Sequence, residues 1–190
     1  VGGTQFDPAK RHDPYEKGKD ELHRHNQSCI VSELNRYGWD DVRNATWGNL
    51  DMNAYHDVPH NLEWTTRGAI DFLDEHGQSD DPFMLYVSYH AIHGPKHGED
   101  VDQLDPRVTP GGLLEEPDLA GHPPRETILT RLRERGIDPY HRNVGALWLD
   151  DSVGVILNKL EDLGLSEDTI VIYKADHGKF AKATVYQPGS

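Results

Sequence analysis

The chain has 190 residues, enough for one domain of ordinary size with a single hydrophobic core. It carries 33 acidic residues against 19 Lys and Arg, and this net charge of −14 argues against a nucleic-acid backbone or an anionic membrane as partner. A single Cys excludes an intramolecular disulfide framework, and no apolar run approaches the ~20 residues of a membrane span.

The first sixty residues are expected to contain one short helix. Residues 1–25 are rich in charge, Gly and Pro, which is typical of a surface loop, and they lack the apolar core of a signal peptide. Apolar residues within 26–37 are followed by a glycine, so this stretch is predicted to be helical. Residues 38–59 are irregular, with glycine and proline breaks.

A firmer helix is predicted over 61–76, and a buried strand follows it. Helical spacing lets four apolar residues share one buried side: Leu62, Ile70, Phe72 and Leu73. Gly77 ends this pattern. The run PFMLYVSY at 82–89 is short, apolar and rich in aromatic residues, which favours a buried strand over a helix.

The rest of the chain repeats this alternation after a long irregular stretch. Residues 90–124 contain many prolines and glycines, and a loop of that length is usually functional or disordered. A short charged helix is predicted over 125–135 and the longest helix over 139–163. The longest helix has apolar residues three and four apart: Leu149, Val153, Ile156, Leu160 and Leu163. The run DTIVIYKA at 168–175 is predicted to be a second buried strand.

Alternating helices and continuous apolar strands indicate an α/β fold. We expect a mostly parallel or mixed sheet flanked by helices. Each predicted strand leads into polar residues that can bind ions: His93 follows the first, and Asp176 with His177 follows the second. Ligands of open α/β sheets bind beyond the carboxyl ends of the strands, so both groups are expected at one rim. Taken singly, the histidine also fits a surface residue, and the Asp-His pair before glycine also fits a turn.

Several segments in series carry a family resemblance. The segments HNLEWTTRGAIDFLDEH, PFMLYVSYHAIHGP, GALWLDDSVGVILNKLEDLGL and DTIVIYKADHG resemble, in order and spacing, the middle of the sulfatase family. This family belongs to the alkaline phosphatase superfamily, and the resemblance covers most of residues 60–190. It implies an alkaline phosphatase-like fold of which this chain holds an incomplete part.

The resemblance also implies roles for four residues. Asp176, and His177 beside it, match positions that ligate a divalent cation in sulfatases, usually Ca²⁺, which prefers oxygen ligands. His93 matches the histidine that contacts the sulfate and protonates the departing alcohol, two tasks that suit a side chain titrating near neutrality. Lys182 matches a lysine that neutralises the sulfate oxygens.

Two neighbouring features are assigned less weight. Lys179 lies closer to the Asp-His pair than Lys182 does, but the context K-A-T-V-Y favours Lys182, although Gln187 replaces the glutamate of the family pattern. His90 and His97 are interpreted as loop residues.

A paired acid in the longest predicted helix is interpreted as structural. Asp150 and Asp151 could suggest a metal site, but the helical periodicity places both in the middle of the helix.

The nucleophile of the family is not found in this chain. Sulfatases use a formylglycine made from Cys or Ser in a C/S-x-P/A-x-R motif, and the sequence around Cys29 has neither the Pro/Ala nor the Arg. In the family this motif lies upstream of the matching segments. We therefore interpret residues 1–190 as a partial catalytic domain, without the nucleophile region and the C-terminal subdomain, and expect the isolated chain to be inactive.

The leading hypothesis is a metal-assisted hydrolase of sulfate esters in the complete protein. The substrate would be a small-molecule or carbohydrate sulfate ester. Two alternatives stay open: a phosphate diester or phosphonate hydrolase of the same superfamily, and a non-catalytic fragment. Many family members are exported, but the sequence specifies neither a compartment nor an oligomeric state.

Overall fold

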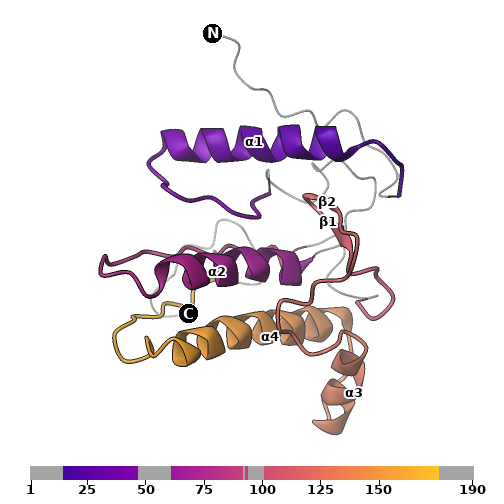
Figure 1. Cartoon of the computed structure of the whole chain (residues 1–190). Helices are drawn as coiled ribbons and strands as arrows, with labels where there is room; N and C mark the ends of the chain where they lie inside the picture. Colours follow the sequence, from indigo (N-terminus) through magenta and orange to yellow (C-terminus); the bar gives the residue numbers. More distant parts are fainter. Residues whose placement is uncertain (1–14, 47–60, 92, 94–100, 176–190) are drawn as a thin grey trace, which may run out of the picture.

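Four helices account for most of the regular structure in the computed structural model, which describes residues 15–46, 61–91, 93 and 101–175 (Figure 1). They are listed in chain order as α1 (Asp20–Arg36), α2 (Leu62–His76), α3 (Thr127–Glu134) and α4 (His141–Asp162). All four predicted helices are therefore confirmed. The prediction of a loop over 1–25 is wrong for residues 20–25, which form the start of α1. The buried residues in this part of the helix, His23 and Asn26, are polar, so the apolar period did not reveal it.

Helix α2 begins and ends where its sequence indicates. The Oδ1 atom of Asn61 accepts a hydrogen bond from the backbone N–H of Trp64 at 2.9 Å, which is an N-cap that satisfies one free donor of the first turn. Leu62, Ile70 and Leu73 are buried as predicted, and Phe72 is half-buried. The predicted extent of this helix and three of its four predicted buried residues are therefore confirmed.

Helices α2 and α4 pack against each other and run in the same direction (Figure 1). Near their N-terminal ends, the indole N–H of Trp148 donates to Glu63 at 2.9 Å. Near their C-terminal ends, Lys159 pairs with Asp74. Just beyond both helices, the side chain of Gln78 donates to the carbonyl of Leu163 at 2.9 Å. The segments after α2 and α4 therefore start at the same end of this helix pair.

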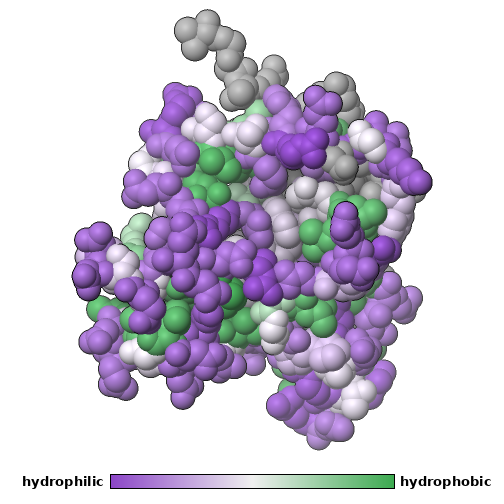
Figure 2. Space-filling view, viewed as in Figure 1, coloured by the Kyte–Doolittle hydropathy of each residue, from purple (hydrophilic) through white to green (hydrophobic). Residues whose placement is uncertain are grey.

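The hydrophobic core lies between α2, α3, α4 and the segment that precedes α3. Its buried members are Leu62, Val101, Ile128, Leu132, Val144 and Trp148. Polar and charged residues cover most of the face seen in Figure 2, with hydrophobic patches among them. The core is thus formed mainly by helices.

The buried side of α4 differs from the prediction. Of the five apolar residues expected on it, only Leu160 is buried, while Leu149, Val153 and Ile156 stay half-buried. The buried side contains Trp148 and Ser152 instead. Trp148 bonds Glu63 of α2, and Ser152 bonds His122 of the loop before α3. These polar contacts, and not the aliphatic spacing, therefore agree with the side of α4 that is buried.

The predicted parallel or mixed sheet is not seen in the described residues. Their only strands are β1 (Val108–Thr109) and β2 (Gly112–Leu113), which pair antiparallel with Val108 opposite Leu113. The prediction that residues 82–89 and 168–175 form buried strands is wrong for this structure. A strand needs neighbours to bond its N–H and C=O groups, and neither segment has a paired neighbour among the described residues.

The two segments nevertheless differ in how they meet the helices. Between residues 82 and 89 exposure alternates, with Phe83, Leu85, Val87 and Tyr89 half-buried and the residues between them exposed. This period of two is typical of an extended chain with one covered face. The second segment is exposed on both faces: Ile170 and Ile172 are 90% and 82% exposed.

The turn between β1 and β2 requires glycine because α2 lies close to it. A Cβ atom on Gly111 would come within 2.6 Å of the Trp64 ring, which real Cβ contacts do not show. Gly112 has a φ of +129°, in the region that favours glycine. The predicted loop at 90–124 therefore contains a small hairpin, packed on α2.

Candidate active site

His93 is exposed and lies in a turn that follows residues 82–89. Its backbone N–H donates to the carbonyl of His90 at 2.7 Å, which closes the turn. An exposed imidazole after an apolar segment can contact a ligand from solvent, as the resemblance implies.

Tyr89 anchors the beginning of this turn to α2. Its hydroxyl lies 2.8 Å from Oγ1 of Thr66, and the Thr66 hydroxyl donates to the carbonyl of Leu62 at 2.8 Å. Because Thr66 has one hydroxyl proton, Tyr89 is the donor of the first bond. Burial raises the pKa of Tyr89 to about 12, so the phenol stays neutral at physiological pH.

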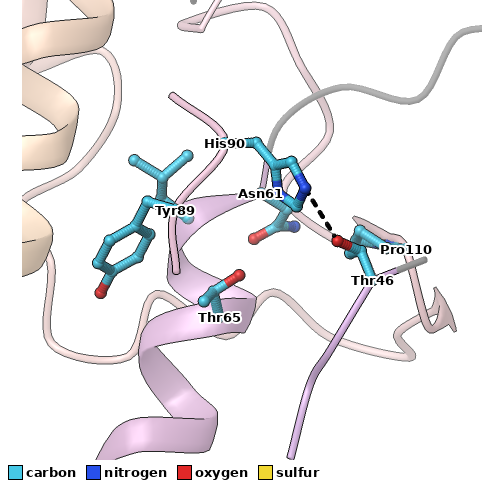
Figure 3. A pocket seen from close by; sticks show the side chains of 7 residues that line it. Thr46, Asn61, Thr65, Tyr89, His90 and Pro110 are labelled. Atoms are coloured by element: carbon cyan, nitrogen blue, oxygen red, sulfur yellow. Dashed lines mark hydrogen bonds between the residues drawn. The ribbon is translucent and has the colours of Figure 1, made fainter. Parts of the chain in front are cut away.

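His90 anchors the same turn on its other side. Its Nε2 atom lies 3.1 Å from Oγ1 of Thr46, within hydrogen-bond distance (Figure 3). The two residues line a small pocket of about 10 Å³. Its other lining residues come from the start of α2, the segment at 82–89 and the hairpin turn: Asn61, Leu62, Thr65, Tyr89 and Pro110. This volume suits one water molecule at most. The interpretation of His90 as an ordinary loop residue missed this contact, because nothing in the sequence links it to Thr46.

Asn61 joins the wall of this pocket to the hairpin. Besides capping α2, its side-chain amide donates to the carbonyls of Pro106 and Val108, both at 2.9 Å. Asn61 is 5% exposed, so its amide replaces water for two buried carbonyls. One side chain therefore fixes α2 and β1 relative to each other.

The other predicted site residues lie outside the described residues. They are Asp176, His177 and Lys182, and Lys179 lies there as well. The expectation that His93 and Asp176 meet at one rim therefore stays a prediction.

The structural interpretation of Asp150 and Asp151 is supported by their position within α4. Arg131 of α3 donates to both carboxylate oxygens of Asp151, at 2.7 and 2.6 Å. This paired contact joins α3 to α4.

A buried ion pair holds α2 to the start of α3. Glu63 is fully buried, and Arg125 donates to its two carboxylate oxygens at 2.8 and 2.7 Å. Trp148 donates to the same carboxylate, and its ring lies 4.7 Å from the Arg125 guanidinium carbon in a cation–π contact. Because the Glu63 carboxylate already has two partners, we interpret the cluster of Glu63, Arg125 and Trp148 as structural, and not Glu63 as a catalytic acid.

A Ser–His contact in the core does not form a nucleophile. The Nε2 atom of His122 lies 2.9 Å from Oγ of Ser152, a distance typical of an activated serine. Ser152 is fully buried, however, and its hydroxyl also lies 2.9 Å from the carbonyl of Trp148. Because this hydroxyl is closed off from solvent, we interpret the contact as a structural link between the loop before α3 and α4.

Three side chains near the C-terminal end of α2 have the spacing of a metal site. The ligand atoms of Asp41, Glu75 and His76 lie within 4.8 Å of one another. Arg43 already donates to Asp41 and Glu75, with its Nη2 atom 2.5 Å from each carboxylate. Its guanidinium holds the pKa of Asp41 below its usual range, so a cation of the protein itself neutralises this group.

Cys29 gives no sign of a catalytic role. It is buried on α1, and its sulfur lies 3.5 Å from Nε2 of His25. A buried thiol in the middle of a helix suits packing.

Comparison with known proteins supplies the family. The sulfatase family model matches residues 9–189, almost the whole chain. The chain therefore belongs to the sulfatase family, as its motifs indicated.

Several relatives extend this assignment. The chain is 27% identical over 182 residues to the ulvan-active sulfatase of Formosa agariphila, covering 90% of this chain and 34% of that protein. It is 26% identical to the uncharacterized sulfatase YidJ of Escherichia coli, over 80% of this chain and 33% of that protein. It is 28% identical to mouse N-acetylgalactosamine-6-sulfatase, over 60% of this chain and 16% of that protein. The chain spans about a third of the length of the two bacterial relatives.

Among the described residues, none of the helices combines the length and apolar character needed to cross a membrane.

Proposed function

We propose that the complete protein hydrolyses sulfate esters and that residues 1–190 form part of its catalytic domain. The family match over residues 9–189 carries this proposal. The mouse relative is named for a sulfated sugar, which favours a carbohydrate sulfate ester as substrate.

The residues of this chain would act on the sulfate group from two segments. His93, in the turn closed by its bond to His90, would contact the sulfate and protonate the departing alcohol oxygen. Lys182 would neutralise charge on the sulfate oxygens and the charge that develops on the departing ester oxygen. Asp176 and His177 would supply two ligands to a divalent cation, which we expect to be Ca²⁺ because a carboxylate suits it. When bound, the cation would stabilise negative charge on the ester.

The role of Lys182 predicts a selective loss of turnover. Charge moves toward the departing oxygen in the transition state, so a fixed ammonium there stabilises the transition state more than the bound ester. Replacing Lys182 with Ala should lower kcat on the order of 10²–10³-fold, the usual effect of removing one such contact. Lys179→Ala is the matched control, because it removes the same charge three residues earlier in the sequence and should change kcat far less.

The test is an assay of the complete protein and both variants on 4-nitrophenyl sulfate, with the metal content of each measured. A crippled Lys179→Ala variant with a normal Lys182→Ala variant would move the catalytic role to Lys179. Turnover of 4-nitrophenyl phosphate diesters or phosphonates in place of the sulfate would support the wider superfamily chemistry. A complete, metal-loaded protein inactive on all three would support a non-catalytic role.

A further inference from the structure

The side chain of His90 ties the turn that carries His93 to a distant part of the chain. His90 is half-buried and its Nε2 atom lies 3.1 Å from the hydroxyl of Thr46, forty-four positions earlier in the sequence (Figure 3). The carbonyl of the same residue accepts the backbone N–H of His93 at 2.7 Å. His90 therefore joins both the pocket wall and the residue proposed to meet the substrate.

The anchor lies beside a hydrogen-bonded part of the fold. The pocket around His90 is bounded by the N-terminal end of α2, through Asn61, and by Pro110 of the hairpin turn. Asn61 is itself fixed by its cap to Trp64 and by its bonds to the hairpin. The His90 side chain is half-buried in this pocket, and its bond to Thr46 holds the ring against the pocket wall.

We propose that His90 is a positioning residue: its hydrogen bond to Thr46 fixes the turn that orients His93 toward the departing oxygen of the ester. This inference rests on the proposed sulfatase function. A general acid works only when its proton lies within hydrogen-bond reach of the oxygen that it protonates, and small misplacements are costly. Loss of the anchor should therefore weaken proton donation by His93 while its imidazole remains present.

This mechanism predicts a dependence on the leaving group. A nitrophenolate leaves readily without a proton, whereas the alkoxide of an alkyl or sugar sulfate needs one. Thr46→Val removes the hydroxyl and keeps the shape of the side chain. In the complete protein it should lower kcat on the order of 10-fold for an alkyl sulfate, and clearly less for 4-nitrophenyl sulfate. The KM values should change less than kcat, since Lys182 and the metal ligands, which would also hold the sulfate, are kept.

Three further variants sharpen the test. His90→Ala should give the same leaving-group dependence, and the double variant should be no worse than His90→Ala, because the two residues act through one bond. His90→Gln, whose amide can reach the Thr46 hydroxyl, should restore part of the lost turnover. Thr65→Val is the matched control: it makes the same change in the wall of the same pocket, where no bond to His90 is found, and should leave both substrates unaffected.

The outcomes separate this inference from the proposed function. An unaltered protein that turns over neither substrate overturns the sulfatase proposal, and this inference with it. Full activity of Thr46→Val, or equal losses on both substrates, overturns the positioning role alone. Thermal unfolding of every variant identifies any that lose their fold, and because Thr46→Val and His90→Gln are mild changes, at least one is expected to keep it.

Discussion

Helices α2, α3 and α4, here called the helical layer, are packed more completely than the two apolar segments that follow α2 and α4. The helices enclose a core whose largest member, Trp148, is 1% exposed, and they are joined by the buried cluster of Glu63, Arg125 and Trp148. The segment at 169–175 shows the opposite pattern, with Ile172 82% exposed. Helices bond their own backbone, whereas strands depend on neighbours. The segment that leads into the proposed metal ligands therefore packs less closely than the helices do.

The largest effect is expected from breaking the buried ion pair of the helical layer. Arg125→Ala leaves the carboxylate of Glu63 buried without its cation, which typically costs about 3–5 kcal/mol. Urea unfolding followed by circular dichroism measures the free energy of unfolding. Arg67→Ala is the control, because its partly exposed pair with Asp118 should contribute about 1 kcal/mol or less. Similar losses in the two variants would contradict the idea that the core cluster holds the layer together.

A smaller loss of stability is expected when the same cluster keeps both charged residues and loses one hydrogen-bond donor. Trp148→Phe retains an aromatic ring but removes the indole N–H that Glu63 accepts at 2.9 Å. A buried group left without one partner typically costs about 1–3 kcal/mol. The same urea experiment measures it, and an unchanged free energy of unfolding would show that Arg125 alone satisfies the carboxylate.

Acidification should weaken the helical layer through His122. Burial lowers the pKa of this imidazole below the usual 6.5, so the unfolded chain binds its proton more readily. The stability that the neutral His122 provides is complete above pH 6.5 and is lost as pH falls through its folded pKa. Asp105, whose pKa is lowered to about 2 by Arg107, loses its contribution only below about pH 4. The free energy of unfolding should fall as the pH is lowered from 7.5 to 5, and His122→Gln should make this fall smaller. An equal fall in the variant would show that another group causes the pH dependence.

The smallest effect is expected in the exposed segment. Ile172→Thr keeps a β-branched side chain and removes apolar surface that is already in solvent, so the free energy of unfolding of this chain should change by less than about 0.5 kcal/mol. Leu73→Ala, a fully buried comparison on α2, should cost about 2–5 kcal/mol. A loss at Ile172 as large as that at Leu73 would mean that the segment is packed in solution.

The sequence allowed the helices to be predicted because their signals are local. The apolar period over 61–76 and the glycine that follows it predict α2 almost to the residue. The buried side of α4 could not be predicted from spacing, since Glu63, which bonds Trp148, lies eighty-five positions away. The same holds for the contact of His90 with Thr46. Strand pairing also depends on distant partners, so the apolar runs indicated extended segments but not the sheet.

The residues of the candidate site were predicted from the motif resemblance, and the structure shows the surroundings of one of these residues, His93. His93 was identified from its His-Gly-Pro context, and its turn, its link to His90 and the adjoining pocket became visible only in three dimensions. Asp176, His177 and Lys182 remain predictions from the family resemblance.

Hydrogen exchange measured by mass spectrometry tests the contrast between the two regions most directly. In the 190-residue chain, backbone amides of α2 and α4 should exchange slowly, while those of residues 83–89 and 170–174 should exchange within seconds because no paired strand protects them. The same segments should become protected in the complete protein if they are strands of its catalytic domain. Slow exchange of both segments in the 190-residue chain would contradict the account, as it would show a sheet already formed within these residues.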